Sequence, residues 1–246
     1  MNKRKVAVFV EGQTELIFVR EFLVKWHSYD ANVIGFDCYN LLNDEFCDTS
    51  YKYGSEDSGN YYMLVNVGND ASVLSKILSR MKYLVNKGYQ VVIGLRDMYS
   101  TQYIRDVKGR WIDSQTNKMY IEAAQEQIAE NPNAQMIRFH FAIMEIEAWF
   151  LGMHKFLESL NDKLTPQFIQ QLNNIDLSAD PEMTIFHPAA ELGKIYALIG
   201  KQYDKHISDI SSIMSKLSID DFKNLMSSGK CQTFKAFAES LLNTTF

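Results

Sequence analysis

The chain has 246 residues, of which 46% are hydrophobic, and its formal net charge is −5. A chain of this length and composition can bury a sizeable core, either as one large domain or as a core with an appended subdomain. The negative charge excludes nucleic-acid binding through overall basicity, so any contact with nucleic acid has to be local.

Cysteine usage and hydropathy bear on the cellular compartment. Cys38, Cys47 and Cys231 show neither CxxC nor metal-ligand spacing, which favours reduced thiols over a disulfide framework. No apolar stretch reaches the length of a membrane span, and the first residues lead into a strand without a signal-peptide pattern. We therefore expect a cytoplasmic protein that does not contact a membrane.

The stretch Lys5–Leu23 predicts a buried strand that a short turn joins to an amphipathic helix. Residues 6–10 (VAVFV) are continuously apolar, as in a strand covered on both faces. Glu11 ends the strand, and Glu15 falls in the first helical turn. Such acids can converge beyond the carboxyl end of a sheet, where oxygen donors suit Mg²⁺ or Mn²⁺. A structural alternative stays open for Glu15, which could simply interact with the helix macrodipole.

Further strands follow in chain order. Residues 33–42 and 61–67 have strand-like content, whereas 46–60 is rich in Asp, Ser, Tyr and Gly and is expected to be a loop. Residues 90–95 (QVVIGL) predict a second strongly buried strand, and Asp97 follows it closely. Two buried strands are thus each followed by an acid, which strengthens the prediction of an acidic site.

Residues 99–116 are polar and are expected to be irregular. This segment concentrates Arg105, Lys108 and Arg110 near the aromatic Tyr103 and Trp111. Such a mixture can contact phosphates and stack on bases, although it is more often a solvated loop, which is the interpretation we favour. If the chain binds nucleic acid, the basic residues of this segment are the predicted contacts, together with Arg96 and Lys201.

A third acidic stretch follows the next predicted strand. Residues 119–130 have a helical pattern, and 135–143 alternate as a strand does. Glu145 and Glu147 come next; on extended backbone they share a face, whereas in a helix they point about 200° apart. Glu147 lies among apolar residues, where a buried acid without a partner is costly, so we favour Glu147 over a solvated Glu145.

From about residue 157 the pattern is helical throughout. The predicted helices are 166–172, 188–199, 206–217, 219–226 and 234–242. Lys201 and Lys205 lie between two of them; surface lysines are the default, but a lysine beside a metal centre would stabilise the charge that develops in phosphoryl transfer. The histidines lack zinc-ligand spacing and no P-loop occurs, so neither zinc binding nor ATP hydrolysis is expected.

Several of these segments together resemble a Toprim-related family of small bacterial proteins. The most specific are EGQTE after the first strand and the EIEAW element of MEIEAWFLG; the acid after VVIGL and the later GKQYDK and CQTFKAF add to them. Proteins of this family are associated with ATPases of the ABC or SMC type and are related to the Toprim nuclease domain of OLD (overcoming lysogenisation defect) proteins. The resemblance implies an α/β fold, with a mainly parallel, Toprim-like sheet flanked by helices in 1–156 and a helical C-terminal region in 157–246.

The resemblance also implies an activity and a set of site residues. Glu11 resembles the Toprim glutamate, and Glu15 resembles the second acid of the same turn. Asp97 resembles the first aspartate of a DxD element, and Glu147, with Glu145 as a second candidate, resembles a later acidic position. The implied protein is an endonuclease that uses Mg²⁺ or Mn²⁺ in an anti-phage defence system, in some relatives directed at tRNA and held inactive by the ATPase.

The resemblance also implies a role for a lysine, and the sequence departs from the family pattern at one position. Lys205, with Lys201 as a second candidate, resembles the lysine of the OLD-type nuclease site. Tyr99 stands where the family has the second aspartate of DxD. Because a phenol with a pKa of about 10 is a poor ligand for Mg²⁺, a second metal ion would be weakly held, held by other ligands, or absent.

Two other functions stay open beside phosphodiester cleavage of DNA or RNA. The first is a catalytically degenerate Toprim-like module that binds an ABC-type ATPase encoded nearby, which Tyr99 and the lack of a strongly basic face favour. The second is an unrelated α/β enzyme that acts on a small phosphorylated molecule with a single Mg²⁺. The choice between DNA and RNA, the identity of the ATPase and the formation of a homo-oligomer stay open.

Overall fold

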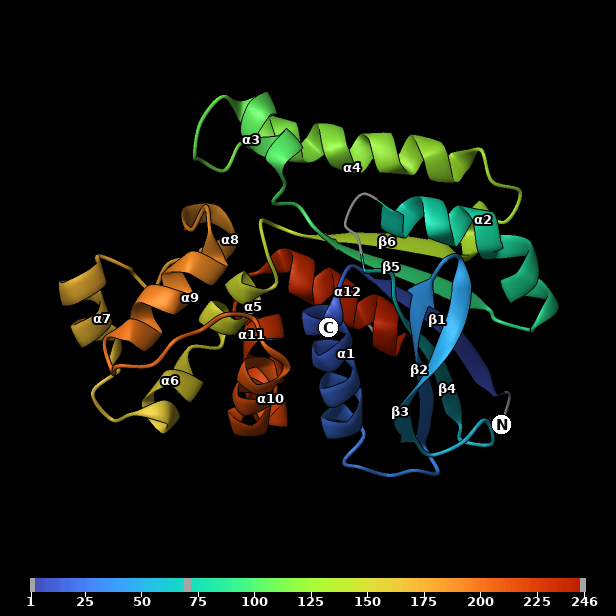
Figure 1. Ribbon diagram of the computed structural model, residues 1–246, viewed down its shortest axis with the longest axis horizontal. Helices are drawn as coiled ribbons and strands as arrows, with labels where there is room; N and C mark the ends of the chain where they lie inside the picture. The colour runs from blue at the N-terminus through green and yellow to red at the C-terminus, as the bar shows by residue number, and fades with distance from the viewer. Residues whose placement is uncertain (1–2, 69–71, 244–246) are drawn as a thin grey trace. The chain divides into compact units, whose positions relative to one another are not determined.

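The computed structural model describes residues 3–68 and 72–243 (Figure 1). Their contacts define two compact units, the first comprising Met1–Arg96 and Tyr120–Phe141 and the second Asp97–Met119 and Ala142–Phe246. The predicted domain boundary at residue 156 differs from the boundaries of these two units. It stays a prediction, because contact density does not measure independent folding. None of the described helices is long and apolar enough to cross a membrane.

The first unit is built on a six-stranded sheet with the strand order β3-β2-β4-β1-β5-β6 (Figure 1). The strands are β1 (Arg4–Val10), β2 (Ile34–Leu42), β3 (Glu45–Tyr53), β4 (Asn60–Asn66), β5 (Val91–Asp97) and β6 (Ile137–Ala142). β1 pairs in parallel with β4 and β5, and β2 pairs in parallel with β4. The predicted α/β class and mostly parallel sheet are confirmed, and the arrangement is consistent with a Toprim-like fold.

The sheet is covered because its central strands are apolar on both faces. Residues 6–10 of β1 are at most 1% exposed, which explains their continuous apolar run. Helix α1 (Gln13–Trp26) packs on β1 and β4, and α2 (Val73–Asn86) packs on β1. Ala7 and Phe9 of β1 share one core cluster with the buried face of α2. That face consists of Val73, Ile77, Met81 and Leu84.

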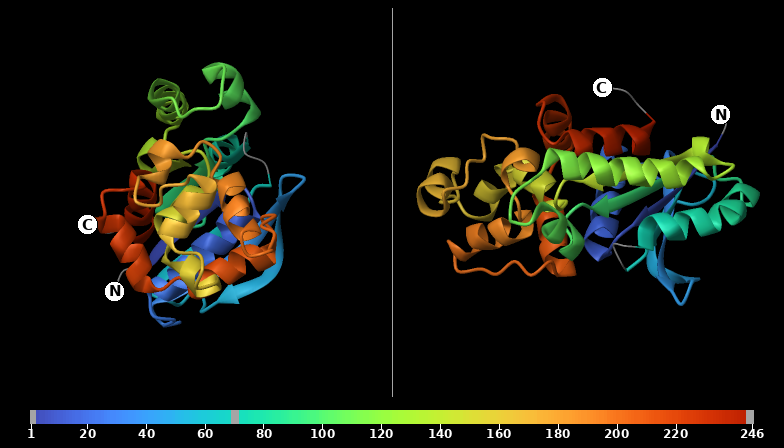
Figure 2. Two further views of the ribbon diagram at one scale, coloured as in Figure 1. Left: turned by 90° about the vertical axis from the view of Figure 1, so that its left-hand side faces the viewer. Right: turned by 90° about the horizontal axis from the view of Figure 1, so that it is seen from above.

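Two segments that the sequence predicted to lack regular structure form elements. Residues 46–60, predicted as a loop, contain most of β3, which runs antiparallel to β2 at one edge of the sheet (Figure 2). An edge strand with a solvated face carries polar side chains, and its composition therefore resembles that of a loop. Residues 99–116 contain α3 (Thr101–Val107), and the Ser100 hydroxyl accepts a hydrogen bond from Tyr103 N at its start.

The second unit is mainly helical, as predicted for the C-terminal region. Besides α3, its helices are α5 (Glu147–Gly152), α6 (Lys155–Leu160), α7 (Pro166–Asn173), α8 (Pro181–Thr184), α9 (Pro188–Ala197), α10 (Ile207–Lys216), α11 (Ile219–Ser227) and α12 (Gln232–Leu242); α4 (Ser114–Ala129) has residues in both units. The five predicted C-terminal helices correspond to α7 and α9–α12. The short helices α6 and α8 were not predicted.

Trp149 anchors α5 within the second unit. Its indole is fully buried, with ring centroids 5.4 Å from Phe234 and 5.7 Å from Phe237 of α12. Its Nε1 donates a hydrogen bond of 2.8 Å to the buried carboxylate of Glu182, whose pKa burial raises. Part of the EIEAW motif is thus explained by packing, since Trp149 fixes the short helix that Glu147 begins.

The ends of β5 and β6 stay paired beyond the strands. Met98 N donates to Ala142 O at 2.9 Å, and Tyr99 N donates to Met144 O at 2.7 Å, so both segments advance in the same direction. Met144 has a left-handed backbone (φ +64°), and Glu145 N closes a tight turn by donating to Ile143 O at 3.1 Å. This turn redirects the chain from β6 into α5.

A half-buried histidine in β6 is expected to make the free energy of unfolding sensitive to acid. Burial, with a smaller contribution from Arg138, lowers the pKa of His140 to about 4, while the unfolded value is about 6.5. The neutral ring therefore contributes stability that is present above pH 6.5 and is lost as the pH falls. Between about pH 8 and pH 5 the loss should be about 2 kcal/mol. Denaturant unfolding at both pH values should show this loss in wild type but not in His140→Gln; equal losses would contradict it.

Candidate metal centre

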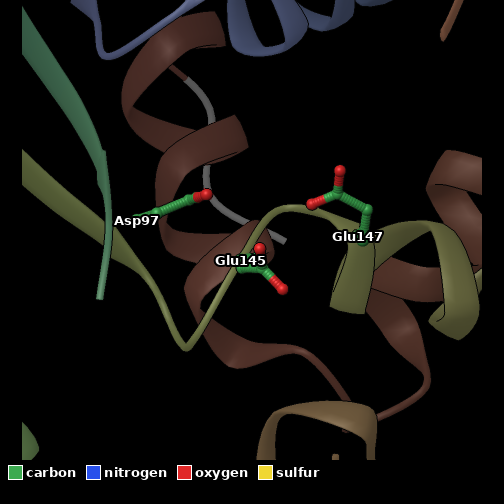
Figure 3. A group of neighbouring side chains, drawn as sticks. All are labelled: Asp97, Glu145 and Glu147. Carbon is green, nitrogen blue, oxygen red and sulfur yellow. The ribbon is translucent and has the colours of Figure 1, made fainter. Parts of the chain in front are cut away.

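Three acids of the second unit form a buried cluster (Figure 3). One carboxylate oxygen each from Asp97, Glu145 and Glu147 lies within 4.8 Å of the others. The residues are 6%, 5% and 0% exposed, respectively. Figure 3 shows the Asp97 and Glu147 side chains directed toward one another from the end of β5 and the start of α5. Three acids at this spacing would repel one another strongly unless a cation compensates them.

Asp97 links the end of β5 to the start of α5. Its Oδ1 accepts a hydrogen bond of 3.1 Å from Ile146 N, the residue between the two glutamates. Because this N–H precedes the first turn of α5, the bond holds the β6–α5 junction against the end of β5. The same bond therefore sets the separation of Asp97 from Glu145 and Glu147.

Glu145 lies at the N-terminus of α9. Its Oε2 accepts a hydrogen bond of 3.0 Å from Ala189 N and lies 3.0 Å from His187 Nδ1. Its Oε1 accepts one of 2.9 Å from Lys205 Nζ. Both oxygens of Glu145 therefore accept hydrogen bonds, one of them from the N-terminus of a helix.

Glu147 is the most deeply buried member of the cluster. Its Oε1 accepts a hydrogen bond of 2.7 Å from the Tyr203 hydroxyl and lies 3.2 Å from Lys205 Nζ. Its Oε2 is also buried and has no hydrogen-bond partner among the described residues. Burial raises the pKa of Glu147; Lys205 opposes this shift, and the neighbouring Glu145 adds to it. A cation is the partner that an ionised Glu147 lacks on its Oε2 side.

Lys205 is the single cation of the cluster among the described residues. Burial alone would lower the pKa of its ammonium group, but attraction to Glu147, Asp97 and Glu145 outweighs burial and raises it. The pKa of the Tyr203 phenol is also raised, by burial and by Glu147, so the phenol stays protonated and donates. Lys205 and Tyr203 therefore act together to compensate Glu147.

The chemistry of these donors fits a divalent metal ion. When all three carboxylates and Lys205 are ionised, these four side chains together carry a net charge of −2. Carboxylate oxygens are the ligands that Mg²⁺ and Mn²⁺ prefer, and Glu147 Oε2 is an unused one. Asp97, Glu145 and Glu147 could thus bind a metal ion.

The first predicted acidic turn belongs to the first unit. Glu11 follows β1 and is half-exposed, and Glu15 is buried in the first turn of α1. The Glu15 carboxylate lies against the backbone of Gly12, where an added Cβ would be 3.1 Å from its Oε2. That contact explains why a glycine is suited to this turn. The prediction that Glu11 and Glu15 share a metal ion with Asp97 and Glu147 stays a prediction.

The predicted nucleic-acid contacts differ in exposure. Arg96 is half-buried, with its guanidinium 5.8 Å from the centre of the Phe141 ring. The other four, Arg105, Lys108, Arg110 and Lys201, are exposed. Between the two lysines considered for the site, only Lys205 contacts the acidic cluster among the described residues. The role of all five in nucleic-acid binding stays a prediction.

Sequence reasoning missed Tyr203 and His187. The segment before Lys205 lies outside any helix, so an alternation of two residues would have placed Tyr203 on the face of Lys205. No local pattern marks His187, which lies 42 positions from Glu145. The ring of Tyr99 packs against the His187 imidazole at a centroid distance of 4.5 Å. Tyr99 therefore packs against a side chain that contacts Glu145.

No protein-family model, curated protein or solved structure matches this chain. Functional interpretation therefore depends on the geometry of the cluster and on the resemblance of the short motifs.

Proposed function

We propose that this protein is a metal-dependent, Toprim-type nuclease that cleaves phosphodiester bonds in DNA or RNA. The observation that carries the proposal is the acidic cluster, in which Glu147 Oε2 is buried without a partner while Lys205 compensates only part of the charge. A purely structural cluster would gain stability by replacing these acids with apolar residues, because unbalanced buried charge is unfavourable. Retaining three acids fits a site that binds a divalent ion.

The residues of the cluster would have different roles in such a site. Asp97, Glu145 and Glu147 would hold Mg²⁺ or Mn²⁺, and the ion when bound would polarise a phosphate oxygen and lower the pKa of bound water. Tyr203 orients Glu147 through Oε1. Lys205 supplies a fixed positive charge where the phosphate gains negative charge in the transition state. Glu11 and Glu15 are kept as predicted further ligands.

Substrate would approach the cluster past His187. This side chain is 41% exposed, although its Nδ1 touches the buried Glu145. It also lines a groove of about 720 Å³ in the second unit, together with Arg110 and Lys194. A phosphate in this groove would lie near Arg110 and near His187, the side chain that contacts Glu145 of the cluster.

The biological setting is proposed from the motif resemblance alone. We place the protein in the cytoplasm, as the effector of an anti-phage system whose partner is an ABC- or SMC-type ATPase. A second candidate function, an ATPase-binding module without cleavage, is favoured by Tyr99. Its ring lies against His187 at the position where the family has an aspartate. Cleavage assays distinguish these two functions.

The proposal is tested by metal binding and cleavage in one series. Wild type should bind Mn²⁺ in calorimetry and cleave a mixture of RNA and DNA substrates with Mg²⁺ or Mn²⁺, but not with EDTA. Asp97→Asn should reduce both about 100-fold, because the amide keeps the acceptor for Ile146 N but loses the charge. Lys163→Gln, which changes an exposed lysine of the second unit, is the matched control.

Each part of this series has an outcome that contradicts the proposal. Cleavage by pure Asp97→Asn at the wild-type rate would exclude the cluster as the nuclease centre. Tight Mn²⁺ binding without cleavage of any nucleic acid, with or without the ATPase, would favour the binding module. Glu11→Gln tests the predicted ligand of the first unit, since unchanged Mn²⁺ affinity would remove Glu11 from the site.

A further inference from the structure

The connection between α3 and α4 presents an exposed tryptophan. Trp111 is 52% exposed, whereas Trp149 is fully buried and Trp26 is half-buried. Single exposed apolar residues are common and need no function by themselves. Trp111 differs because its ring occupies the space beside the backbone of Gly109.

The ring of Trp111 lies close to Gly109. A Cβ at position 109 would lie 1.7 Å from Trp111 Cζ3 and 2.4 Å from Cε3, so only a glycine leaves room for the indole there. The six-membered ring of the indole therefore lies in the space beside the Gly109 backbone that a Cβ would occupy. The side chain stays 52% exposed in this position. A flat aromatic surface held in this way can stack on another ring with little loss of side-chain entropy.

The charges around Trp111 are mostly positive. Arg105, Lys108 and Arg110 are exposed and make no ion pair within residues 3–68 and 72–243. Of the two nearby acids, Asp113 lies at the start of α4, where its Oδ1 accepts a hydrogen bond of 2.7 Å from Thr116 N. The other, Asp106, accepts a hydrogen bond from Gln102 Nε2. An aromatic face among unpaired cations is complementary to a nucleic-acid strand.

The same loop borders the groove whose lining includes His187, a contact of the acidic cluster. Arg110 lines this groove, and so does His187, whose Nδ1 is 3.0 Å from Glu145 Oε2. Its wall also contains the apolar Ile185 and Phe186. The loop, the groove and the cluster all belong to the second unit. A strand bound at Trp111 can thus continue along the groove toward the predicted metal centre.

We propose that the Gly109–Trp111 loop binds single-stranded nucleic acid by stacking one base on the open face of Trp111, while Lys108 and Arg110 contact the flanking phosphates. The inference rests on the proposed nuclease function and names the substrate as unpaired rather than duplex. A base inside a duplex already has both faces stacked on its neighbours, so Trp111 can stack only on an unpaired base. Sequence preference is not required, because every base offers such a face.

The test measures binding in EDTA, where the proposed cleavage cannot occur. Fluorescein-labelled 12-nucleotide oligo(dT) and oligo(U) are titrated with the full chain and followed by anisotropy, beside a duplex of the same length. Trp111→Ala should weaken single-strand binding about tenfold, and Trp111→Phe should retain most of the affinity. Leu172→Ala removes another exposed apolar side chain of the second unit and should leave binding unchanged. Arg110→Gln should reduce by about one the number of counterions released on binding, as measured by the slope of log affinity against log salt concentration.

The outcomes separate this inference from the nuclease proposal. Wild-type affinity in a folded Trp111→Ala protein, or duplex binding as tight as single-strand binding, would overturn the stacking role. Quenching of tryptophan fluorescence by oligonucleotide in wild type, lost in Trp111→Phe, would support it. Cleavage without an effect of Trp111 contradicts only the stacking site, and stacking without cleavage contradicts only the nuclease. The DNA and RNA arms show which strand is preferred.

Discussion

Replacing Lys205 by methionine is expected to lower the free energy of unfolding of the metal-free protein by about 3 kcal/mol. Lys205 Nζ lies 2.9 Å from Glu145 Oε1 and 3.2 Å from Glu147 Oε1, so its removal leaves both carboxylates without their cation. Breaking a buried ion pair by removing one partner typically costs 3–5 kcal/mol. The lower end applies here because the Lys205 side chain is 35% exposed. Methionine keeps most of the side-chain length, so the change isolates the charge.

Mn²⁺ is expected to restore much of the stability that Lys205→Met loses. A divalent cation bound by the three acids would replace the missing charge, and its binding free energy adds to the stability of the folded state. The increase in unfolding free energy on adding saturating Mn²⁺ should therefore be larger for Lys205→Met than for wild type, as measured by urea titration. Lys201→Met, at an exposed lysine, should behave as wild type in both conditions. Equal stability of wild type and Lys205→Met in EDTA would contradict this account of the cluster.

The strands and the acids that follow them were predictable because they depend on local pattern. A strand covered on both faces is continuously apolar, and β1 and β5 both have this signature. β3 was missed for the opposite reason. An edge strand keeps one face in water, and its polar residues carry no signal that separates it from a loop.

The arrangement of Glu145 and Glu147 shows where periodicity stops being informative. Strand geometry would place both on one face and helix geometry would separate them, but neither applies at this junction. Met144 takes a left-handed conformation, Glu145 precedes α5, and Glu147 is the first residue of α5. Both carboxylates therefore reach Asp97. A rule that assumes one regular backbone cannot describe the turn between two elements.

The partners of the cluster come from far along the chain. Tyr203 lies 56 positions from Glu147, Lys205 lies 60 positions from Glu145, and His187 lies 42 positions from Glu145. Only Lys205 carried a sequence signal, through the resemblance of the GKQYDK segment. The packing of α5 against α8 and α9 brings the others to the acids, and such long-range contacts leave no trace in hydrophobic spacing.

The isosteric change Glu147→Gln is expected to reduce the cleavage rate about 1000-fold and to abolish the Mn²⁺ effect on unfolding. Glutamine can still accept the Tyr203 hydroxyl on its Oε1, so the local structure has a reason to persist. The substitution removes the negative charge of the Glu147 side chain, which is 0% exposed and lies beside the carboxylate of Glu145. Cleavage of the best nucleic-acid substrate and urea unfolding with and without Mn²⁺ provide the two measurements.

Glu147→Gln and Lys205→Met should shift metal-free stability in opposite senses. The glutamine variant removes a buried negative charge from a cluster with excess negative charge, so in EDTA it should be at least as stable as wild type. The methionine variant removes the only compensating cation that the described residues supply and should be less stable. A cluster whose charges were already balanced would lose stability in both variants, because either change would leave an unpaired buried charge. Destabilisation of Glu147→Gln in EDTA by about 2 kcal/mol would therefore contradict the excess negative charge on which the proposed metal centre depends.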